Sequence, residues 1–397
     1  MKVLFWLSIG LDRRTPSEHL LTSIIEALYK RGHTVHILQK DTGGESKELY
    51  PKLRELGVTT TKIGVDYASQ NNLVSRYFLD IKYVSKCSKW IKNNDDFDRI
   101  FLQSSNVAGF QMRVLNKYMK STPVVFNVQD LFPENAVYSK KISSHSLVYY
   151  FFSLNQKYAY KNASAILTIS EDIKEELIRI GVDEKKIVVV YNWSYQDAPY
   201  DVNLASNKNI RKFLSADNFN VVYAGNIGLM QNVEVVIETA RHSTDPSVLF
   251  HIFGDGAYKQ RLIDKAKGLD NVRFWHMLPK EEAPALYSCA DVIIVPLAPN
   301  IYRTALPSKT ATCLAVHVPV IFCIGRDSIF AKKVEEKTGC PCLDSSDVEG
   351  VLSCIEKFRK GNLKSNTEDF FSEYMSMTKN SMKYAEVIEN GISELSE

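Results

Sequence analysis

A single lysine stands in an otherwise uncharged stretch near residue 309. Residues 304–321 read TALPSKTATCLAVHVPVI and follow an apolar run, DVIIVPLA (291–298), that is typical of a buried strand. Pro307 and Ser308 suit the first turn of a helix over 308–316, where a proline loses no hydrogen bond. A cation there opposes the helix dipole. Lys309 is therefore better placed to pair with an anion such as phosphate, and a solvated surface lysine is the alternative.

Two glycine-containing turns in the same half could contribute to a phosphate site. Gly225 and Gly228 lie at the end of a strand expected over 219–228, and Gly254 and Gly256 at the end of one expected over 248–256. Without side chains, backbone N–H groups can approach a ligand, and the helix that follows points its positive end at the same place. A purely structural turn is the alternative for both, and for Gly-Asp-Gly it is at least as good an interpretation.

These turns belong to a chain in which strands alternate with helices. The first half begins with a strand over 2–10, a helix over 17–32 and a strand over 33–40, and the second half repeats this order from residue 219. Such alternation predicts parallel sheets built from βαβ units. We therefore expect an α/β fold of two doubly wound, Rossmann-like domains facing a cleft, with ligands at the carboxyl ends of the strands.

The composition is that of an ordinary globular protein. The 397 residues are 45% hydrophobic and 24% charged, with a net charge of +3, so disorder and nucleic-acid binding are not expected. The seven cysteines show no zinc spacing and indicate reduced core thiols in a cytoplasmic protein. The apolar start reads as a core strand, and the run LVYYFF (147–152) is too short to span a bilayer.

Two basic segments rich in aromatic residues are compatible with a membrane surface. Residues 76–92 and 139–161 interleave lysines with large apolar side chains. Basic amphipathic helices of this kind can lie on anionic membranes. The alternative is a half-buried helix with a solvated lysine face, so we expect a cytoplasmic protein that is at most peripheral on the cytoplasmic face of the membrane.

The order of the segments resembles glycosyltransferase family 4. The second half carries YAGNIGLMQNVEVVIETA, FHIFGDGAYKQRL, NVRFWHMLPKEEAPALYSCADVIIVPL and LPSKTATCLAVHVPVI, and the first half carries SEHLLTSIIEALYKRGHTVHIL, FNVQDLFPENA and AILTISEDIKEELIRIGVDEKKIVVVYNWS. The resemblance covers about residues 15–325 and is nearest to the branch that builds bacterial capsule, O-antigen and exopolysaccharide. It implies a GT-B fold and retaining transfer of a sugar, expected from a UDP-sugar, to a lipid-linked saccharide.

The resemblance also implies domain roles. Residues 1–195 would bind the acceptor, 219–375 the nucleotide sugar, 196–218 would link them, and a helix in 376–397 would return to the first domain. The implied site residues fall into three sets. The catalytic candidates are Lys309, Asn226, Arg303, Asp130 and Gln129. The donor-binding candidates are Gly225, Gly228, Gln231, Gly254, Gly256, His276, Met277, Leu278, Pro307, Ser308 and Thr312. The acceptor-binding candidates are Gly10, Arg13, Arg14 and Glu134.

The sequence departs from the family pattern at several of these positions. Asn226 and Gln231 stand where many members have Arg and Lys, and Gln129 where many have a His. Thr312 and Thr304 stand where two glutamates are usual, which leaves the ribose contacts open. Arg303 is a candidate for the missing second positive charge.

No metal or other cofactor is expected, because Lys309 and the glycine turn would neutralise the leaving diphosphate. The acidic run Asp95-Asp96-Phe97-Asp98 precedes a strand and reads as a polar loop. Two alternatives remain: a nucleotide-sugar epimerase of the same fold, and a degenerate protein that binds a nucleotide or a partner without catalysis. A nicotinamide-dependent oxidoreductase is disfavoured because the first strand lacks a G-x-G-x-x-G turn.

Overall fold

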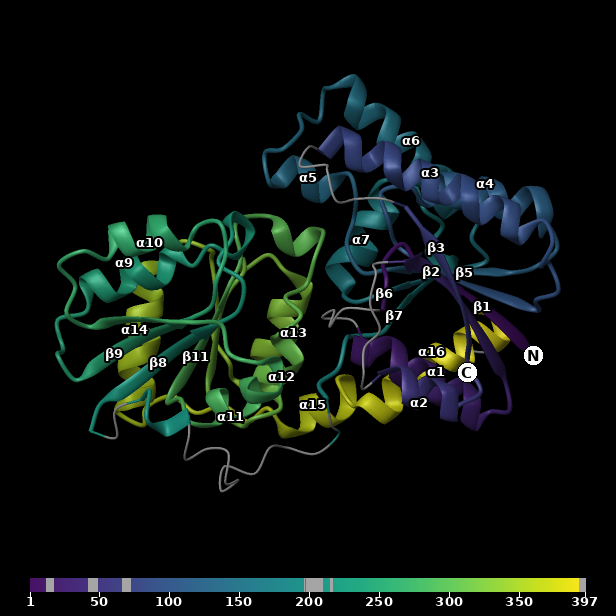
Figure 1. Ribbon diagram of the computed structural model, residues 1–397. Coiled ribbons are helices and arrows are strands. Elements are labelled where there is room, and N and C mark those ends of the chain that lie inside the picture. Colours follow the sequence, from purple (N-terminus) through teal and green to yellow (C-terminus); the bar gives the residue numbers. More distant parts are fainter. Residues whose placement is uncertain are drawn as a thin grey trace. The chain divides into compact units, whose positions relative to one another are not determined.

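The computed structural model describes residues 1–11, 18–41, 49–65, 73–195, 197, 210–214 and 217–392, apart from the side chains of 49–50 and 73–74. The chain divides into two compact units (Figure 1). The first holds Met1–Tyr191 together with Met377–Glu397, and the second holds Asn192–Ser376. The division falls a few residues before the predicted end of the first domain, and most of the predicted linker, 196–218, lies outside the described residues.

The first unit is built on a seven-stranded, all-parallel sheet in the order β3-β2-β1-β4-β5-β6-β7. The strands are β1 (Lys2–Trp6), β2 (Thr34–Asp41), β3 (Thr59–Gly64), β4 (Arg99–Gln103), β5 (Val124–Val128), β6 (Ala165–Thr168) and β7 (Ile187–Val189). Every residue of β5 and β6 is buried, as expected for central parallel strands covered on both faces. The strand order reverses between β1 and β4, the place where doubly wound sheets bind ligands.

Helices cover both faces of this sheet (Figure 1). They are α1 (Glu18–Lys30), α2 (Leu49–Glu55), α3 (Leu73–Ile91), α4 (Ala108–Tyr118), α5 (Glu134–Tyr138), α6 (Leu147–Asn162), α7 (Glu171–Arg179) and α16 (Met377–Asn390), with a 3-10 turn η1 (Glu184–Lys186). The last helix, α16, packs against α1 although their sequence positions are far apart. Arg31 at the end of α1 pairs with Glu389, and the backbone carbonyl of Glu389 accepts a 3.1 Å hydrogen bond from Arg99.

The second unit repeats the architecture with six parallel strands in the order β10-β9-β8-β11-β12-β13. The strands are β8 (Phe219–Ala224), β9 (Val248–Phe253), β10 (Val272–Trp275), β11 (Val292–Pro296), β12 (Val320–Cys323) and β13 (Cys342–Leu343). The predicted α/β fold of two parallel-sheet units is thus confirmed. Here the order reverses between β8 and β11, so the turn after β8 lies at the ligand-binding position.

The helices of the second unit are mostly short. They are α9 (Glu234–His242), α10 (Lys259–Lys265), α11 (Ala283–Ser288), α12 (Thr310–Leu314), α13 (Ile329–Thr338), α14 (Val348–Arg359) and α15 (Glu368–Tyr374), with 3-10 turns η2 (Leu229–Gln231), η3 (Lys280–Glu282) and η4 (Ile301–Arg303). The helix predicted over 308–316 is shorter than expected. It begins after Lys309 and ends at Leu314, because Ala315 with ψ −8° leaves the helical backbone, and the left-handed His317 (φ 55°) then prevents the helix from resuming.

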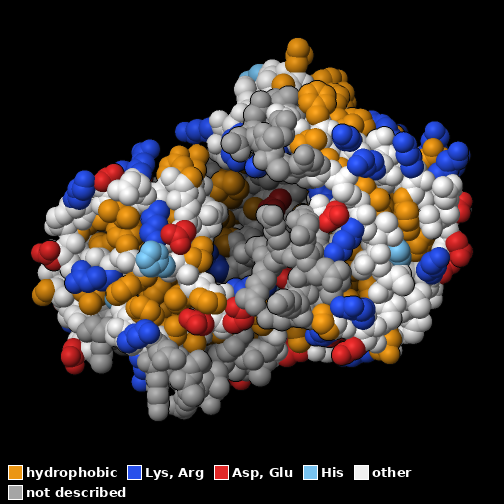
Figure 2. Space-filling view, viewed as in Figure 1, with side chains coloured by type: hydrophobic (Ala, Val, Ile, Leu, Met, Phe, Trp, Pro, Cys, Tyr) orange, Lys and Arg blue, Asp and Glu red, His pale blue; other side chains and the backbone are white. Residues whose placement is uncertain are grey.

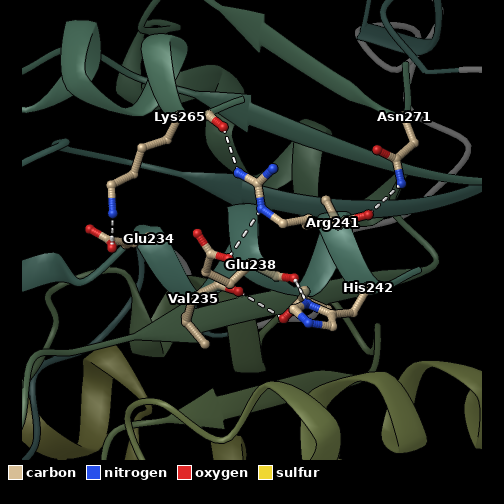
Figure 3. A network of polar contacts seen from close by, with 9 residues as sticks. Glu234, Val235, Glu238, Arg241, His242, Lys265 and Asn271 are labelled. Atoms are coloured by element: carbon tan, nitrogen blue, oxygen red, sulfur yellow. Dashed lines mark hydrogen bonds and ion pairs between the residues drawn. The ribbon is translucent and has the colours of Figure 1, made fainter. Parts of the chain in front are cut away.

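A polar network fastens α9 to α10 and to the start of β10 (Figure 3). Lys265 pairs with Glu234, while Arg241 donates to Glu238 at 3.3 Å and to the backbone carbonyl of Lys265 at 2.6 Å. Asn271 donates to the carbonyl of Ala240 at 2.8 Å. Each charge in this cluster has a partner within it, so we interpret the network as structural.

Candidate active site

Lys309 and the Gly225 turn come together at the carboxyl end of β8. Lys309 Nζ donates a 3.0 Å hydrogen bond to the carbonyl oxygen of Ala224, a residue 85 positions earlier in the chain. The same Nζ lies 3.7 Å from the centre of the Tyr223 ring. Gly225 has φ +144°, and a Cβ there would lie 3.0 Å from Nζ. The position therefore requires glycine both for its backbone conformation and for the approach of the lysine.

The electrostatic state of Lys309 favours an anionic ligand. Its side chain is half-buried, and Nζ contacts a carbonyl oxygen and an aromatic ring, neither of which carries a full negative charge. Burial lowers the pKa of this ammonium to about 7. The neighbouring Cys313 thiol has its pKa raised by burial to about 12 and stays neutral. A diphosphate beside Nζ would therefore supply the charge that the described contacts lack.

The Gly-Asp-Gly turn braces the Gly225 turn. The N–H of Gly225 donates to Phe253 O at 2.9 Å, and the N–H of Ile227 donates to Asp255 O at 2.9 Å. A Cβ on Gly254 would lie 1.9 Å from the carbonyl oxygen of Gly225, and one on Gly256 would lie 2.3 Å from that of Ile227. Close packing of the two turns therefore explains both glycines without requiring that they contact a ligand.

The polar side chains of the Gly225 turn form a hydrogen bond with each other. Asn226 is exposed, and its Nδ2 donates to Gln231 Oε1 at 3.1 Å. The carbonyl of Asn226 accepts a 2.5 Å bond from the buried Tyr223 hydroxyl. A Cβ on Gly228 would lie 2.7 Å from Gln231 Oε1. Asn226 and Gln231, which stand where many family members have Arg and Lys, carry no charge. Among the described residues, Lys309 is therefore the cation shown to contact the Gly225 turn.

Lys259 organises the loop predicted to hold the base, and sequence reasoning missed it. Its Nζ donates to the carbonyls of Gly254 at 2.7 Å and Trp275 at 2.9 Å, and pairs with Asp255 at 2.8 Å. Asp255 also accepts the N–H of Met277 at 3.1 Å. Asp255 itself has its pKa lowered by these hydrogen bonds, that from Lys259 first. The N–H of Met277 is therefore already engaged.

The remaining residues of this loop and of the Lys309 segment vary in exposure. His276 and Met277 are exposed, and Leu278 is half-buried. Ser308 is exposed and Pro307 half-buried, immediately before Lys309. Arg303 ends η4, with its guanidinium 5.4 Å from the Tyr302 ring centre. These side chains border the loops at the strand ends, where a ligand could reach them.

Thr304 and Thr312, which occupy the positions of the family glutamates, are buried. The Thr304 hydroxyl donates to Ile301 O at 3.1 Å, and the Thr312 hydroxyl lies 3.5 Å from that of Ser194. Both hydroxyls thus have partners inside the second unit. Neither residue presents a carboxylate to a ribose.

In the first unit, Gln129 belongs to a chain of amide hydrogen bonds beyond the end of β5. Gln129 Nε2 donates to Asn127 Oδ1 at 3.1 Å and lies 3.2 Å from the hydroxyl of Tyr384 on α16. Asn127 in turn donates to Gln103 at 3.0 Å. The network holds the Gln129 amide through two hydrogen bonds of its Nε2, and it also ties α16 to the sheet.

Asp130 faces a polar cavity of about 210 Å³ at the carboxyl ends of β4 and β5. The cavity is lined by Ser104, Ser105, Asn106, Phe126, Asp130, Phe132, Asn135, Gln156 and Tyr160. Asp130 is partly exposed to solvent. The protein that surrounds its carboxyl group nevertheless excludes much of the water there, and this burial raises the pKa of Asp130 to about 6. Gln156 is buried, and its Nε2 donates to Ser105 O at 2.6 Å. Amides, hydroxyls and one carboxylate beside aromatic rings suit a ligand rich in hydroxyl groups.

Neither Gly10 nor Glu134, the two predicted acceptor residues that the structure describes, lines this cavity. Glu134 is buried at the start of α5, where its Oε1 accepts a 3.3 Å bond from the Tyr149 hydroxyl. Burial is the main cause that raises the pKa of Glu134. Gly10 is also buried, and Arg13 and Arg14 lie outside the described residues. Glu134 therefore presents little surface to an acceptor.

Two features are absent from the described residues. Within the described ranges, no group of three or more His, Cys, Asp or Glu side chains is arranged to hold a metal ion. No described helix is both long and apolar enough to cross a membrane.

Comparison with known proteins places this site in a family. Residues 17–193 match the sequence model of Glycosyltransferase Family 4, and residues 218–358 match that of Glycosyl transferases group 1. The chain therefore belongs to glycosyltransferase family 4, and it is a glycosyltransferase with the two parallel-sheet units of the GT-B fold. The resemblance inferred from the sequence is confirmed.

Two similar sequences and one solved structure of similar fold illustrate the match. The chain is 23% identical over 336 residues to a Pseudomonas aeruginosa protein named as a glycosyltransferase, WbjE, covering 79% of this chain and 80% of that one. It is 28% identical over 209 residues to the Escherichia coli (strain K12) protein WcaI, whose name assigns it to colanic acid biosynthesis, covering 49% and 46% of the two chains. The solved structure of Anabaena HepE in complex with UDP has a TM-score of 0.69 at 16% identity, covering 98% of this chain and 100% of that one.

Proposed function

We propose that this glycosyltransferase moves a sugar from a UDP-sugar to a lipid-linked saccharide, with retention of anomeric configuration, in bacterial surface polysaccharide biosynthesis. The observation that carries the proposal is the placement of Lys309 Nζ against the Gly225 turn at the switch point of the second sheet. The names of WbjE and WcaI and the UDP bound to HepE support the pathway and the nucleotide.

The chemistry asked of this site is stabilisation of a leaving diphosphate. Breaking the bond between sugar and nucleotide separates a cation-like sugar from a diphosphate, so fixed positive charge near the diphosphate lowers the barrier. Lys309 would supply that charge, and the N–H groups beyond Gly225 would supply oriented dipoles. Asn226, exposed in the same turn, would contact the diphosphate, and Arg303 is a second cationic candidate. We propose that no metal is needed for this step.

The acceptor would occupy the first unit. The cavity beside Asp130 offers the amides of Asn106, Asn135 and Gln156, and planar amides form paired hydrogen bonds with neighbouring hydroxyl groups. Gln129, fixed by its own network, lies next to Asp130 in the chain. We assign acceptor contact to these residues, in place of the buried Glu134. A lipid-linked acceptor would bring the protein to the cytoplasmic face of a membrane.

Thermal unfolding in the presence of nucleotides tests the proposal. UDP, GDP, ADP and CDP are added to the wild type, to Lys309→Met and to a matched control, Lys267→Met, which changes an exposed lysine of the same unit. A nucleotide at a hundredfold excess over its Kd stabilises by about 2.7 kcal/mol, which is a measurable rise in Tm. We expect UDP to stabilise the wild type and the control, and Lys309→Met much less.

Measuring the release of UDP during turnover distinguishes the proposed transferase from an epimerase and from a non-catalytic protein. A transferase should release UDP from its UDP-sugar faster when a lipid-linked saccharide is added, whereas an epimerase would release it at a rate independent of acceptor. A degenerate protein would be stabilised by UDP without any release. If folded wild type is stabilised by none of the four nucleotides, the assignment of Lys309 to a diphosphate is wrong.

A further inference from the structure

Helix α6 turns a stripe of apolar side chains to water. Four exposed side chains share one stripe at helical spacing: Leu147 (86% exposed), Tyr150 (62%), Phe151 (45%) and Leu154 (48%). Val148 beside them is 51% exposed. On the inner side, Asn155, Gln156, Ala159 and Tyr160 are buried. An ordinary surface helix has polar residues on its outer side, so burial in this unit does not explain the outer apolar stripe.

The apolar stripe continues onto the start of α3. Tyr77 of α3 contacts Phe152 of α6, with the two ring centres 4.8 Å apart, and Phe78, the next residue, is 64% exposed. Six of the ten most exposed large hydrophobic side chains in the described chain therefore belong to α3 and α6. Figure 2 shows hydrophobic side chains gathered over this end of the unit, with Lys and Arg side chains over the neighbouring helices. We call α3, α4 and α6 together the helical face.

The helical face carries almost only positive charge. Its three helices contain eight Lys or Arg residues and one acidic residue, Asp80, which is buried and pairs with Lys40 at 2.5 Å. The formal charge is +7, in a chain whose total is +3, so the rest of the chain is net negative. The basic residues are Arg76, Lys82, Lys86, Lys89, Arg113, Lys117, Lys157 and Lys161, and all are exposed.

Two of these basic side chains, Arg113 and Lys86, donate hydrogen bonds to uncharged acceptors. Arg113 donates to the carbonyl of Gly109 at 2.9 Å and to Asn155 Oδ1 at 2.8 Å, and Lys86 donates to the carbonyl of Gly64 at 2.5 Å. These acceptors are uncharged. Along α6 itself the apolar stripe gives way to Lys157 and Lys161 in the last turns, which is how a helix is arranged when it enters a bilayer at one end and meets headgroups at the other.

We propose that the helical face docks on an anionic lipid bilayer, with Leu147, Tyr150, Phe151 and Leu154 inserted between headgroups and the lysines of α3, α4 and α6 bound to lipid phosphates. Charge complementarity selects a membrane over a second copy of the chain, because two faces of +7 would repel. The inference deepens the proposed function: the inner side of α6 contributes Gln156 and Tyr160 to the polar cavity, so docking would hold that cavity next to the headgroups of a lipid-linked acceptor.

Vesicle binding by the full chain tests the proposal. Wild type is co-sedimented with vesicles of phosphatidylcholine alone and with about 30% phosphatidylglycerol added, at low and high salt. Leu147→Ser/Tyr150→Ser/Leu154→Ser removes three of the four side chains of the stripe, with Tyr29→Ser, a 51% exposed tyrosine of α1, as its control. Lys82→Gln/Lys89→Gln removes two charges, with the exposed pair Lys30→Gln/Lys383→Gln as its control.

We expect binding to the anionic vesicles only, weakening with salt. The triple serine variant should lose at least about tenfold in affinity, and the glutamine pair about fivefold for each lysine, while both controls bind as wild type does. Equal binding to both vesicle types, or unchanged binding by both variants, would overturn the proposal. The proposal would also be overturned if the wild type sedimented as a dimer and the triple serine variant sedimented as a monomer. Stabilisation by UDP is measured in the same samples. It tests the proposed transferase independently, so a failure of membrane docking can be distinguished from a failure of the proposed function.

Discussion

At the scale of single residues, Lys309 is the group whose chemistry the site controls most. Burial lowers the pKa of its ammonium to about 7, so in the empty site the charge is lost as the pH rises through neutrality. A bound diphosphate would favour the charged form and raise that pKa, so binding above neutral pH must take up a proton. Affinity for UDP should therefore fall as the pH rises above about 7, approaching tenfold per pH unit.

Calorimetric titration with UDP at about pH 8 checks this. The binding enthalpy should differ between buffers of different ionisation enthalpy, and the difference should correspond to uptake of nearly one proton. Lys309→Arg stays charged at every pH used and should remove the pH dependence, even if the longer side chain weakens binding. A pH dependence that survives in Lys309→Met would assign the proton to another group.

At the scale of elements, the two glycine turns of the second unit should act as one packed piece. Gly254→Ala places a Cβ 1.9 Å from the backbone of Gly225, whereas Gly268→Ala, also at a positive φ, meets nothing within 4 Å. The Gly268 variant should lose about 1–2 kcal/mol through backbone strain alone. Gly254→Ala should lose at least about 3 kcal/mol, because the backbone must also move. Chemical denaturation of both variants measures the difference, and equal losses would contradict the packing argument.

The sequence predicted much of this arrangement because apolar runs mark strands and parallel strands end at one edge. That reasoning placed Lys309 and Gly225 at the same site, although the lysine's acceptor, Ala224, lies 85 positions away. Strand ends were less well predicted: β8 stops at Ala224, before the expected residue 228, because Gly225 turns the chain at positive φ. The role of Lys259 could not be predicted, since its acceptors come from the ends of two strands and a turn.

The cavity in the first unit was also beyond sequence reasoning. Asn106 and Gln156 come from segments without a recognisable motif, and only the packing of α6 over β4 and β5 brings them together. Glu134 is the opposite case, a residue that the sequence proposed for acceptor binding but that the structure buries. It belongs to a segment that resembles the family, yet α6 covers it, and Tyr149 takes its carboxylate as a hydrogen-bond acceptor. Motif position predicts the neighbourhood of a side chain better than it predicts exposure.

At the scale of the whole molecule, the chain builds its first unit from both of its ends. Helix α16 contributes the buried residues Tyr384, Val387 and Ile388, and it packs against α1. Burying each of these large side chains stabilises a fold by about 1.5–3 kcal/mol. Their combined loss is comparable with the whole stability of a domain, about 5–15 kcal/mol. The second unit, Asn192–Ser376, takes no residue from α16.

A chain that ends at Ser376 should therefore lose the first unit and keep the second. In calorimetry we expect the unfolding transition that does not respond to UDP to disappear, while the transition that UDP raises remains. A chain ending at Ile392 is the matched control, because it keeps α16 whole, and it should unfold as the full chain does. If the chain ending at Ser376 still shows both transitions at their original temperatures, α16 is an accessory to the first unit. The hydrogen bonds that the Tyr384 hydroxyl donates to Asn127 and accepts from Gln129 then contribute little to the stability of that unit.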